Sequence, residues 1–127
     1  MTRDSQVFAV IQKYDGRAFH YGADCCQFAG EVVEILTGAN PMDQFEYSTK
    51  VEAKSILSSL GGLKDAVIQV LGAPKRTRPI MSGDVAMVRL STGLAAAVAY
   101  KNKLVVRTPT GVTDYQLERA LCSWEVD

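Results

Sequence analysis

Residues 24–38 of this chain read DCCQFAGEVVEILTG, and they carry the clearest helical pattern in the sequence. At 100° per residue the apolar side chains share one wide face. That face consists of Cys25, Phe28, Ala29, Val32, Ile35 and Leu36, and the opposite face of Gln27, Gly30, Glu31 and Glu34. Asp24 is a suitable N-cap, and Gly38 is a typical C-terminal signal. The pattern therefore predicts a helix over residues 25–36, with Cys25 at the centre of the apolar face.

Three weaker helical patterns accompany this one. Residues 7–14 have apolar side chains at i, i+3, i+4 and i+7, with Ser5 available as a cap. Residues 48–60 predict a helix whose inward side chains are Val51, Ile56, Leu57 and Leu60. Residues 63–71 also repeat at helical spacing, and glycines separate and end these last two helices.

From residue 84 onward the apolar pattern changes to one that is typical of strands. Strands are predicted over residues 84–90, 94–100 and 103–107, with a tight turn between the last two. Residues 115–126 predict one or two further strands, with Trp124 and Val126 facing inward. Helices followed by an antiparallel meander indicate the α+β class, and residues 1–127 are interpreted as a single domain.

Composition excludes several classes of protein. The chain has 127 residues, of which 47% are hydrophobic, as in a globular domain. Its 14 basic and 14 acidic residues give a formal net charge of zero, so no nucleic-acid partner is expected. The basic loop at residues 74–79 is interpreted as solvated, or as a docking element for an acidic protein. No apolar run reaches the ~20 residues of a membrane span, and three cysteines, two of them adjacent, predict a reducing, intracellular origin.

Cys25 lies where a thiol can be activated. The unpaired N–H groups and the positive end of the dipole at a helix N-terminus both favour the reactive thiolate. Gly22 would let the backbone approach closely, and Asp24 would hold the helix start. His20, the single histidine, is the candidate base, although an exposed loop histidine is the plainer interpretation. Periodicity alone favours a buried, inert Cys25, because cysteine is among the most buried residue types.

Two further candidate sites have plainer interpretations. Asp24 and Asp84 could be paired carboxylates, but each precedes a predicted element, where capping and turn formation are the usual roles. Cys25, Cys26, Cys122 and His20 lack the spacing of a zinc site. No metal ion and no cofactor is therefore predicted.

Two motifs, taken in order, resemble those of the NlpC-like cell-wall cysteine peptidases, which have a papain-like fold. Tyr21-Gly22-x-Asp24-Cys25 before an apolar helix is similar to their nucleophile motif. Ser82-Gly83-Asp84-Val85 is similar to the Pro-Gly-Asp-Leu that starts their first core strand. The chain most resembles a small phage-encoded branch, usually found among siphophage tail genes, with an Asp-Cys-Cys-x-Phe-Ala helix start and a C-terminal tryptophan strand.

The resemblance implies a compact papain-like fold in which Cys25 is the nucleophile. Active members place their general-base histidine at the start of the strand that follows the Gly-Asp strand. This chain has no histidine in residues 91–98, nor anywhere after Cys25. A thiolate without a base lacks the group that protonates a leaving amine, so the resemblance favours a scaffold without peptidase activity.

The function implied by the resemblance is that of a phage tail protein, which acts in tail-tip or hub assembly. Such a protein would be made in the cytoplasm of the bacterial host and carried in the virion tail. Its partners would be hub, tape-measure or tail-tip proteins, and residues 94–99 or the end of the chain would be docking surfaces. The alternative is an active peptidoglycan endopeptidase that uses Cys25, with His20 as the base, during genome entry. A non-catalytic binder of cell-wall fragments is a third interpretation.

Overall fold

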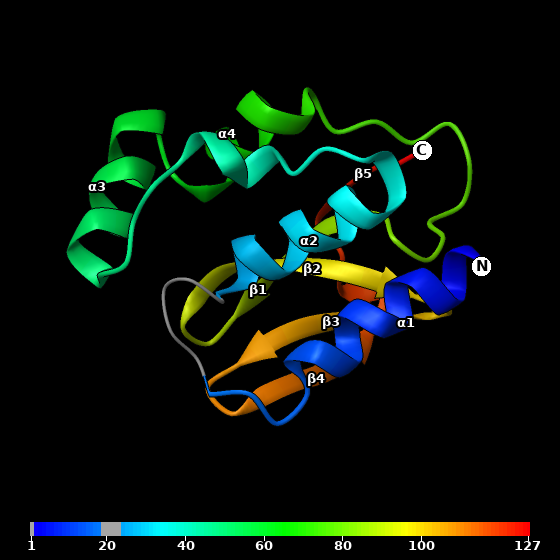
Figure 1. The fold of residues 1–127 in the computed structure, drawn as a ribbon. Coiled ribbons are helices and arrows are strands. Elements are labelled where there is room, and N and C mark those ends of the chain that lie inside the picture. The colour runs from blue at the N-terminus through cyan, green and yellow to red at the C-terminus, as the bar shows by residue number, and fades with distance from the viewer. Residues whose placement is uncertain (1, 19–23) are drawn as a thin grey trace.

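The computed structural model describes residues 2–18 and 24–127, in which four α-helices accompany a five-stranded antiparallel sheet (Figure 1). The helices are α1 (Arg3–Tyr14), α2 (Cys25–Thr37), α3 (Lys50–Leu60) and α4 (Leu63–Leu71), with short 3-10 helices η1 (Pro41–Gln44) and η2 (Leu117–Arg119). The strands are β1 (Val85–Leu90), β2 (Gly93–Tyr100), β3 (Lys103–Thr108), β4 (Gly111–Gln116) and β5 (Cys122–Trp124). The predicted α+β class is confirmed.

The sheet has the order β4-β3-β2-β1-β5. Successive hairpins join β1 to β4, and β5 then returns to the free edge of β1, where Trp124 pairs with Val85. The first three predicted strands agree with β1, β2 and β3 to within one residue. β4 begins at Gly111, four residues before the predicted start at residue 115. The prediction missed its first residues because the side chains of β4 are mostly polar or exposed and show little apolar alternation.

Helix α2 packs on the sheet and forms the main core together with α1 (Figure 1). Its predicted caps are confirmed, since Asp24 accepts a hydrogen bond from the Gln27 N–H and Gly38 has a φ of 90°. The predicted apolar face is wrong at two positions. Ile35 is 36% exposed, whereas Gly30 is buried because η1 packs against it, at a distance that leaves no room for a Cβ atom.

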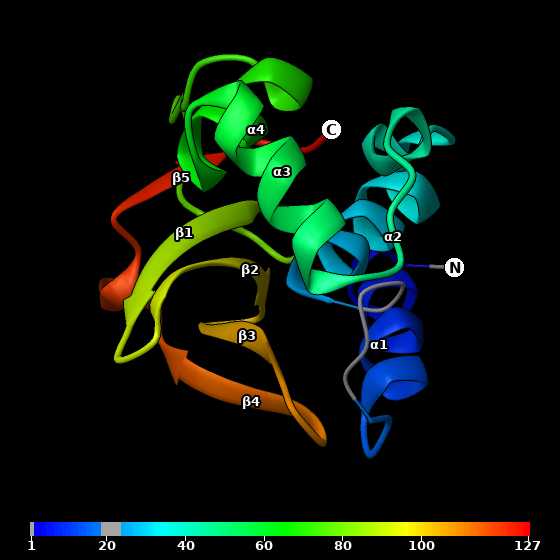
Figure 2. The ribbon, with the colours of Figure 1, turned by 90° about the vertical axis from the view of Figure 1, so that its left-hand side faces the viewer.

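The two faces of β2 lie in different cores. Ala96 and Val98 lie in the core formed with α1 and α2. Ala95, Ala97 and Ala99 form a second core with Leu104 and Val106 of β3. Figure 2 shows the curve of the strands. The prediction that residues 94–99 form a docking surface is wrong. β2 has β1 and β3 as neighbours, and residues 95–99 are buried.

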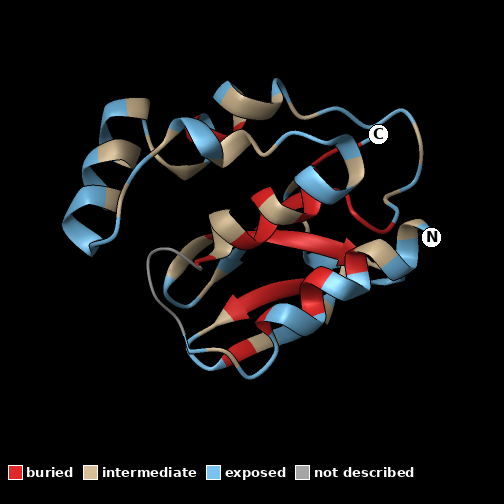
Figure 3. Cartoon of the chain, viewed as in Figure 1, coloured by how far each residue is buried: buried red, intermediate tan, exposed pale blue. Residues whose placement is uncertain are grey.

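The α3–α4 hairpin is the least buried part of the helical layer (Figure 3). None of residues 50–60, all of which the structure describes, is fully buried. The predicted inward position of Val51 is wrong, because Val51 is 77% exposed in the first turn after the Thr49 cap. At α1 the cap is Thr2 instead of the predicted Ser5, since the Ser5 N–H donates to the Thr2 side chain.

Candidate functional site

Asp24 ties the start of α2 to the loop that follows η1. One carboxylate oxygen accepts from the Gln27 N–H at 2.9 Å, and the other accepts from the Tyr47 hydroxyl at 2.7 Å. Burial, reinforced by the hydrogen bond to Asp24, raises the pKa of the Tyr47 phenol well above its usual value. Tyr47 therefore keeps its proton and acts as a hydrogen-bond donor to Asp24, and the capping role predicted for Asp24 is confirmed.

The adjacent thiols of Cys25 and Cys26 shift each other's pKa values at this helix start. The Cys26 S–H donates to the Cys25 sulfur, and this lowers the pKa of Cys25, although burial opposes the shift. The Ala96 N–H of β2 donates to the same sulfur and favours its thiolate as well. Cys26 keeps its proton, because its pKa is raised by this hydrogen bond and by burial. The arrangement supports one thiolate, at Cys25, with Cys26 as its donor.

Strand β2 lies where a catalytic base would be expected from the resemblance. Its side chains there are Leu94 and Ala96, which line the same cavity as the two cysteines. Neither side chain can accept or donate a proton. The predicted residues His20, Tyr21 and Gly22 lie outside the described residues. The described part of the site thus has a thiol that can be activated, but no imidazole beside it.

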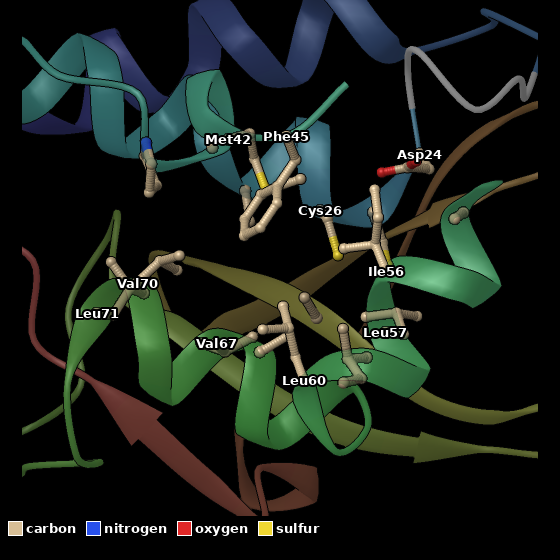
Figure 4. A pocket seen from close by; sticks show the side chains of 18 of the residues that line it. Asp24, Cys26, Met42, Phe45, Ile56, Leu57, Leu60, Val67, Val70 and Leu71 are labelled. Atoms are coloured by element: carbon tan, nitrogen blue, oxygen red, sulfur yellow. The ribbon is translucent and has the colours of Figure 1, made fainter. Parts of the chain in front are cut away.

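An apolar cavity of about 250 Å³ lies beside the thiols, between α2, η1, the α3–α4 hairpin and the sheet (Figure 4). The Cys26 sulfur points into it, toward Ile56 of α3, and Phe45 and Val67 enclose it from other sides. Sequence reasoning did not find this cavity, because its walls come from segments far apart in the chain. The signal available in the sequence is the row of apolar residues in α3, Ile56, Leu57 and Leu60, which line the cavity.

Asp84 is the centre of a buried ion-pair cluster. It is 1% exposed, and Arg78 donates to both of its oxygens at 2.7 and 3.1 Å. Arg3 of α1 donates at 3.3 Å, and the N–H groups of Met81 and Val126 donate at 3.0 Å each. The hydrogen bonds to Asp84 raise the pKa of the Arg78 guanidinium. Asp84 thus joins α1, the basic loop and the end of the chain, which is more than the predicted turn role.

The basic loop and Gly83 both serve this cluster. The interpretation of residues 74–79 as solvated is wrong for Arg78, which also pairs with Asp127 at 3.0 Å. Gly83 has a φ of 94°, and a Cβ atom there would lie 2.3 Å from the Leu36 side chain. The Gly-Asp motif therefore positions the start of β1 against α1 and α2.

The sequence matches a domain of unknown function, DUF6950, over residues 2–126. The chain belongs to the DUF6950 family. The matched region of this DUF6950 protein includes Cys25, the apolar cavity and the Asp84 cluster. Comparison with curated proteins gave no match.

Two other predictions concern metal binding and a membrane-spanning segment. In residues 2–18 and 24–127 of this DUF6950 chain, no three or more His, Cys, Asp or Glu side chains are grouped so that they could hold a metal ion. No helix in this described part is both long and apolar enough to span a bilayer.

We predict that Cys26→Ala shifts the alkylation profile of Cys25 to higher pH, because it removes the side chain that lowers the pKa of Cys25 most. The check is the rate of iodoacetamide labelling against pH, followed for each cysteine by mass spectrometry. Cys26→Ser retains an O–H donor and should keep the lower midpoint. Cys122→Ala is the control. An unchanged midpoint in Cys26→Ala would contradict the donor role of Cys26.

Proposed function

We propose that this protein is a structural component of a phage tail, built on an NlpC-like, papain-like scaffold without peptidase activity. The observation that carries the proposal is the contact between the start of α2 and β2. Cys25 packs in the same core cluster as Ala96 and Leu94 of β2, and both of these side chains are apolar. In the resembled peptidases this strand supplies the general base.

The chemistry of the site supports a role in assembly. Hydrolysis of an amide by a thiol requires a group that protonates the leaving amine. Cys26 keeps its proton too strongly for that role, and Asp24 is held by its hydrogen bonds to Gln27 and Tyr47. The described residues therefore stabilise a thiolate without supplying a proton to a leaving group.

The protein would be made in the cytoplasm of the bacterial host and then carried in the virion tail. Its partners would be hub, tape-measure or tail-tip proteins. The strand β4 is a suitable contact surface because it lies at an edge of the sheet and residues 113–114 are exposed. An exposed strand edge offers unpaired backbone groups to a neighbouring protein.

We predict that Cys25→Ala leaves tail assembly unchanged in a phage that carries this gene. Alanine removes the thiolate but keeps the helix start, because the Asp24 cap is unaffected. The measurements are plaque titre and the yield of tailed particles by electron microscopy, with the wild-type gene and a deletion as references. Intact tails with a titre reduced tenfold or more would contradict a purely structural role.

The second candidate function is an active cysteine hydrolase that cuts peptidoglycan during genome entry. The lowered pKa of Cys25 favours it, since the thiolate is the nucleophile. Incubation of the purified protein with isolated cell wall tests it, with mass spectrometry of the released stem-peptide fragments. Release that Cys25→Ala abolishes would establish the hydrolase, whereas pull-down without release would establish a wall binder.

A further inference from the structure

We propose that a groove beside β5 docks an acidic peptide segment of another protein, one that also carries a bulky apolar side chain. This β5 groove has a volume of about 180 Å³. It is lined by residues 74–76 and 80, from the segment that joins α4 to β1, and by residues 120–123 at β5. The role in a phage tail proposed above makes no use of this groove, and the inference holds independently of that role.

The backbone of the basic loop is fixed beside β5 (Figure 1). The Lys75 N–H donates to the Ser123 carbonyl at 3.2 Å. The N–H groups of Thr77 and Arg78 donate to the Glu125 carboxylate at 2.8 and 3.0 Å. A site that is already ordered loses less conformational freedom when a partner binds. The loop is therefore ordered before a partner arrives.

Two cationic side chains of this loop can meet a partner. Lys75 and Arg76 are exposed, and neither forms an ion pair with another residue in the described part of the chain. Glu125 and Asp127, the acidic residues that follow β5, are both paired with Arg78. The β5 groove thus presents two positive charges, although the whole chain has a formal net charge of zero.

An apolar surface accompanies these charges. Leu121 is 59% exposed, while its N–H donates to the Met87 carbonyl at 2.8 Å and holds the backbone in place. Ile80 and Ala120 also line the groove. A partner that covers this surface removes it from water, which favours binding. A cavity of about 150 Å³ in another protein holds benzene, so the ring of a phenylalanine matches the size of this groove.

This combination of charge and apolar surface favours a peptide over a nucleic acid. Nucleic-acid sites use many cations along one face, because their affinity comes from several phosphate contacts. The β5 groove has two cations, Lys75 and Arg76. Exposed ion pairs contribute little affinity each, but they select the partner and speed association. Carboxylates on both sides of an aromatic side chain match the groove, with binding that is weak and sensitive to salt.

The test measures binding of the peptide GDEFEDG, which carries an uncharged fluorophore, to the full chain by fluorescence polarisation. We expect a dissociation constant below about 1 mM in about 50 mM salt, and binding at least about fivefold weaker in about 500 mM salt. GNQFQNG lacks the charges and GDEAEDG lacks the ring, and each should bind at least about fivefold more weakly than GDEFEDG. If either binds equally well, or if GDEFEDG does not bind below about 1 mM, the proposal is overturned.

Variants of the chain locate the binding. Lys75→Glu combined with Arg76→Glu should weaken binding of GDEFEDG about tenfold, because two attractions become repulsions. Lys50→Glu combined with Lys54→Glu is the matched control, since it makes the same change in net charge at exposed positions of α3, outside the groove. Leu121→Ser should weaken binding about threefold, because it removes apolar contact.

The three variants change exposed side chains, so their melting temperatures should stay within a few degrees of that of the unsubstituted protein. An equal loss of binding in the control would mean that net charge attracts the peptide, and would overturn the assignment to the β5 groove. Tighter binding of a single-stranded oligonucleotide than of GDEFEDG, lost in the variant of Lys75 and Arg76, would assign the groove to nucleic acid instead.

Discussion

Asp84→Asn should lower the free energy of unfolding by about 3 kcal/mol, a large share of the 5–15 kcal/mol that is typical of a domain. Asp84 is 1% exposed and its carboxylate accepts five hydrogen bonds, three of them from Arg3 and Arg78. An asparagine amide would remove the charge and turn N–H groups toward these donors. This expected loss is at the lower end of the roughly 3–5 kcal/mol that breaking a buried ion pair costs. The reason is that the side chains of Arg3 and Arg78 are partly exposed, at 22% and 25%.

The measurement for Asp84 is urea denaturation followed by circular dichroism. A loss of this size should lower the midpoint by about 1–2 M. Asp114→Asn is the matched control, since Asp114 is exposed on β4, and it should change stability by less than about 0.5 kcal/mol. If both variants unfold at the same urea concentration, the Asp84 cluster does not stabilise the fold.

Helix α2 could be predicted almost completely, because everything that determines it lies within residues 24–38. Its caps are local hydrogen bonds, and its core face follows from periodicity. The error at Gly30 arises from η1, whose position depends on tertiary packing, and Ile35 is 36% exposed. The prediction for Val51 was wrong because α3 packs mainly against α4 and leaves Val51 exposed.

The site could be predicted only in part. Asp24 and Cys25 were found because their roles depend on the start of a single helix. The donor role of Cys26 was missed, although two adjacent thiols at a helix start are a signal that could have indicated it. The role of Asp84 depends on Arg3, which is 81 residues away, and on Val126, which is 42 residues away. No local sequence pattern indicates hydrogen-bond partners that lie this far apart in the chain.

Arg107 is a further residue whose importance is not visible in its strand. The sequence predicts a strand over residues 103–107 and assigns no role to Arg107. Arg107 is 6% exposed, and it donates to the Arg17, Ala18 and Gly111 carbonyls. Its guanidinium lies 5.2 Å from the centre of the Tyr14 ring. Burial lowers the pKa of Arg107, yet three carbonyls and an aromatic ring compensate the buried charge.

Arg107→Met should therefore cost about 3 kcal/mol, because methionine fills the space but removes three hydrogen bonds from a charged donor, one of them to the buried Gly111 carbonyl. The effect on local opening of the chain at Arg17 should exceed the effect on overall stability. Arg107 donates to the carbonyl of the Arg17–Ala18 peptide bond, which trypsin cleaves. We expect faster tryptic cleavage after Arg17 under native conditions, together with a lower melting temperature. Arg89→Met, on the exposed side of β1, should change neither. Cleavage after Arg17 at the wild-type rate would mean that other contacts hold this segment, and that Arg107 contributes only packing to the core.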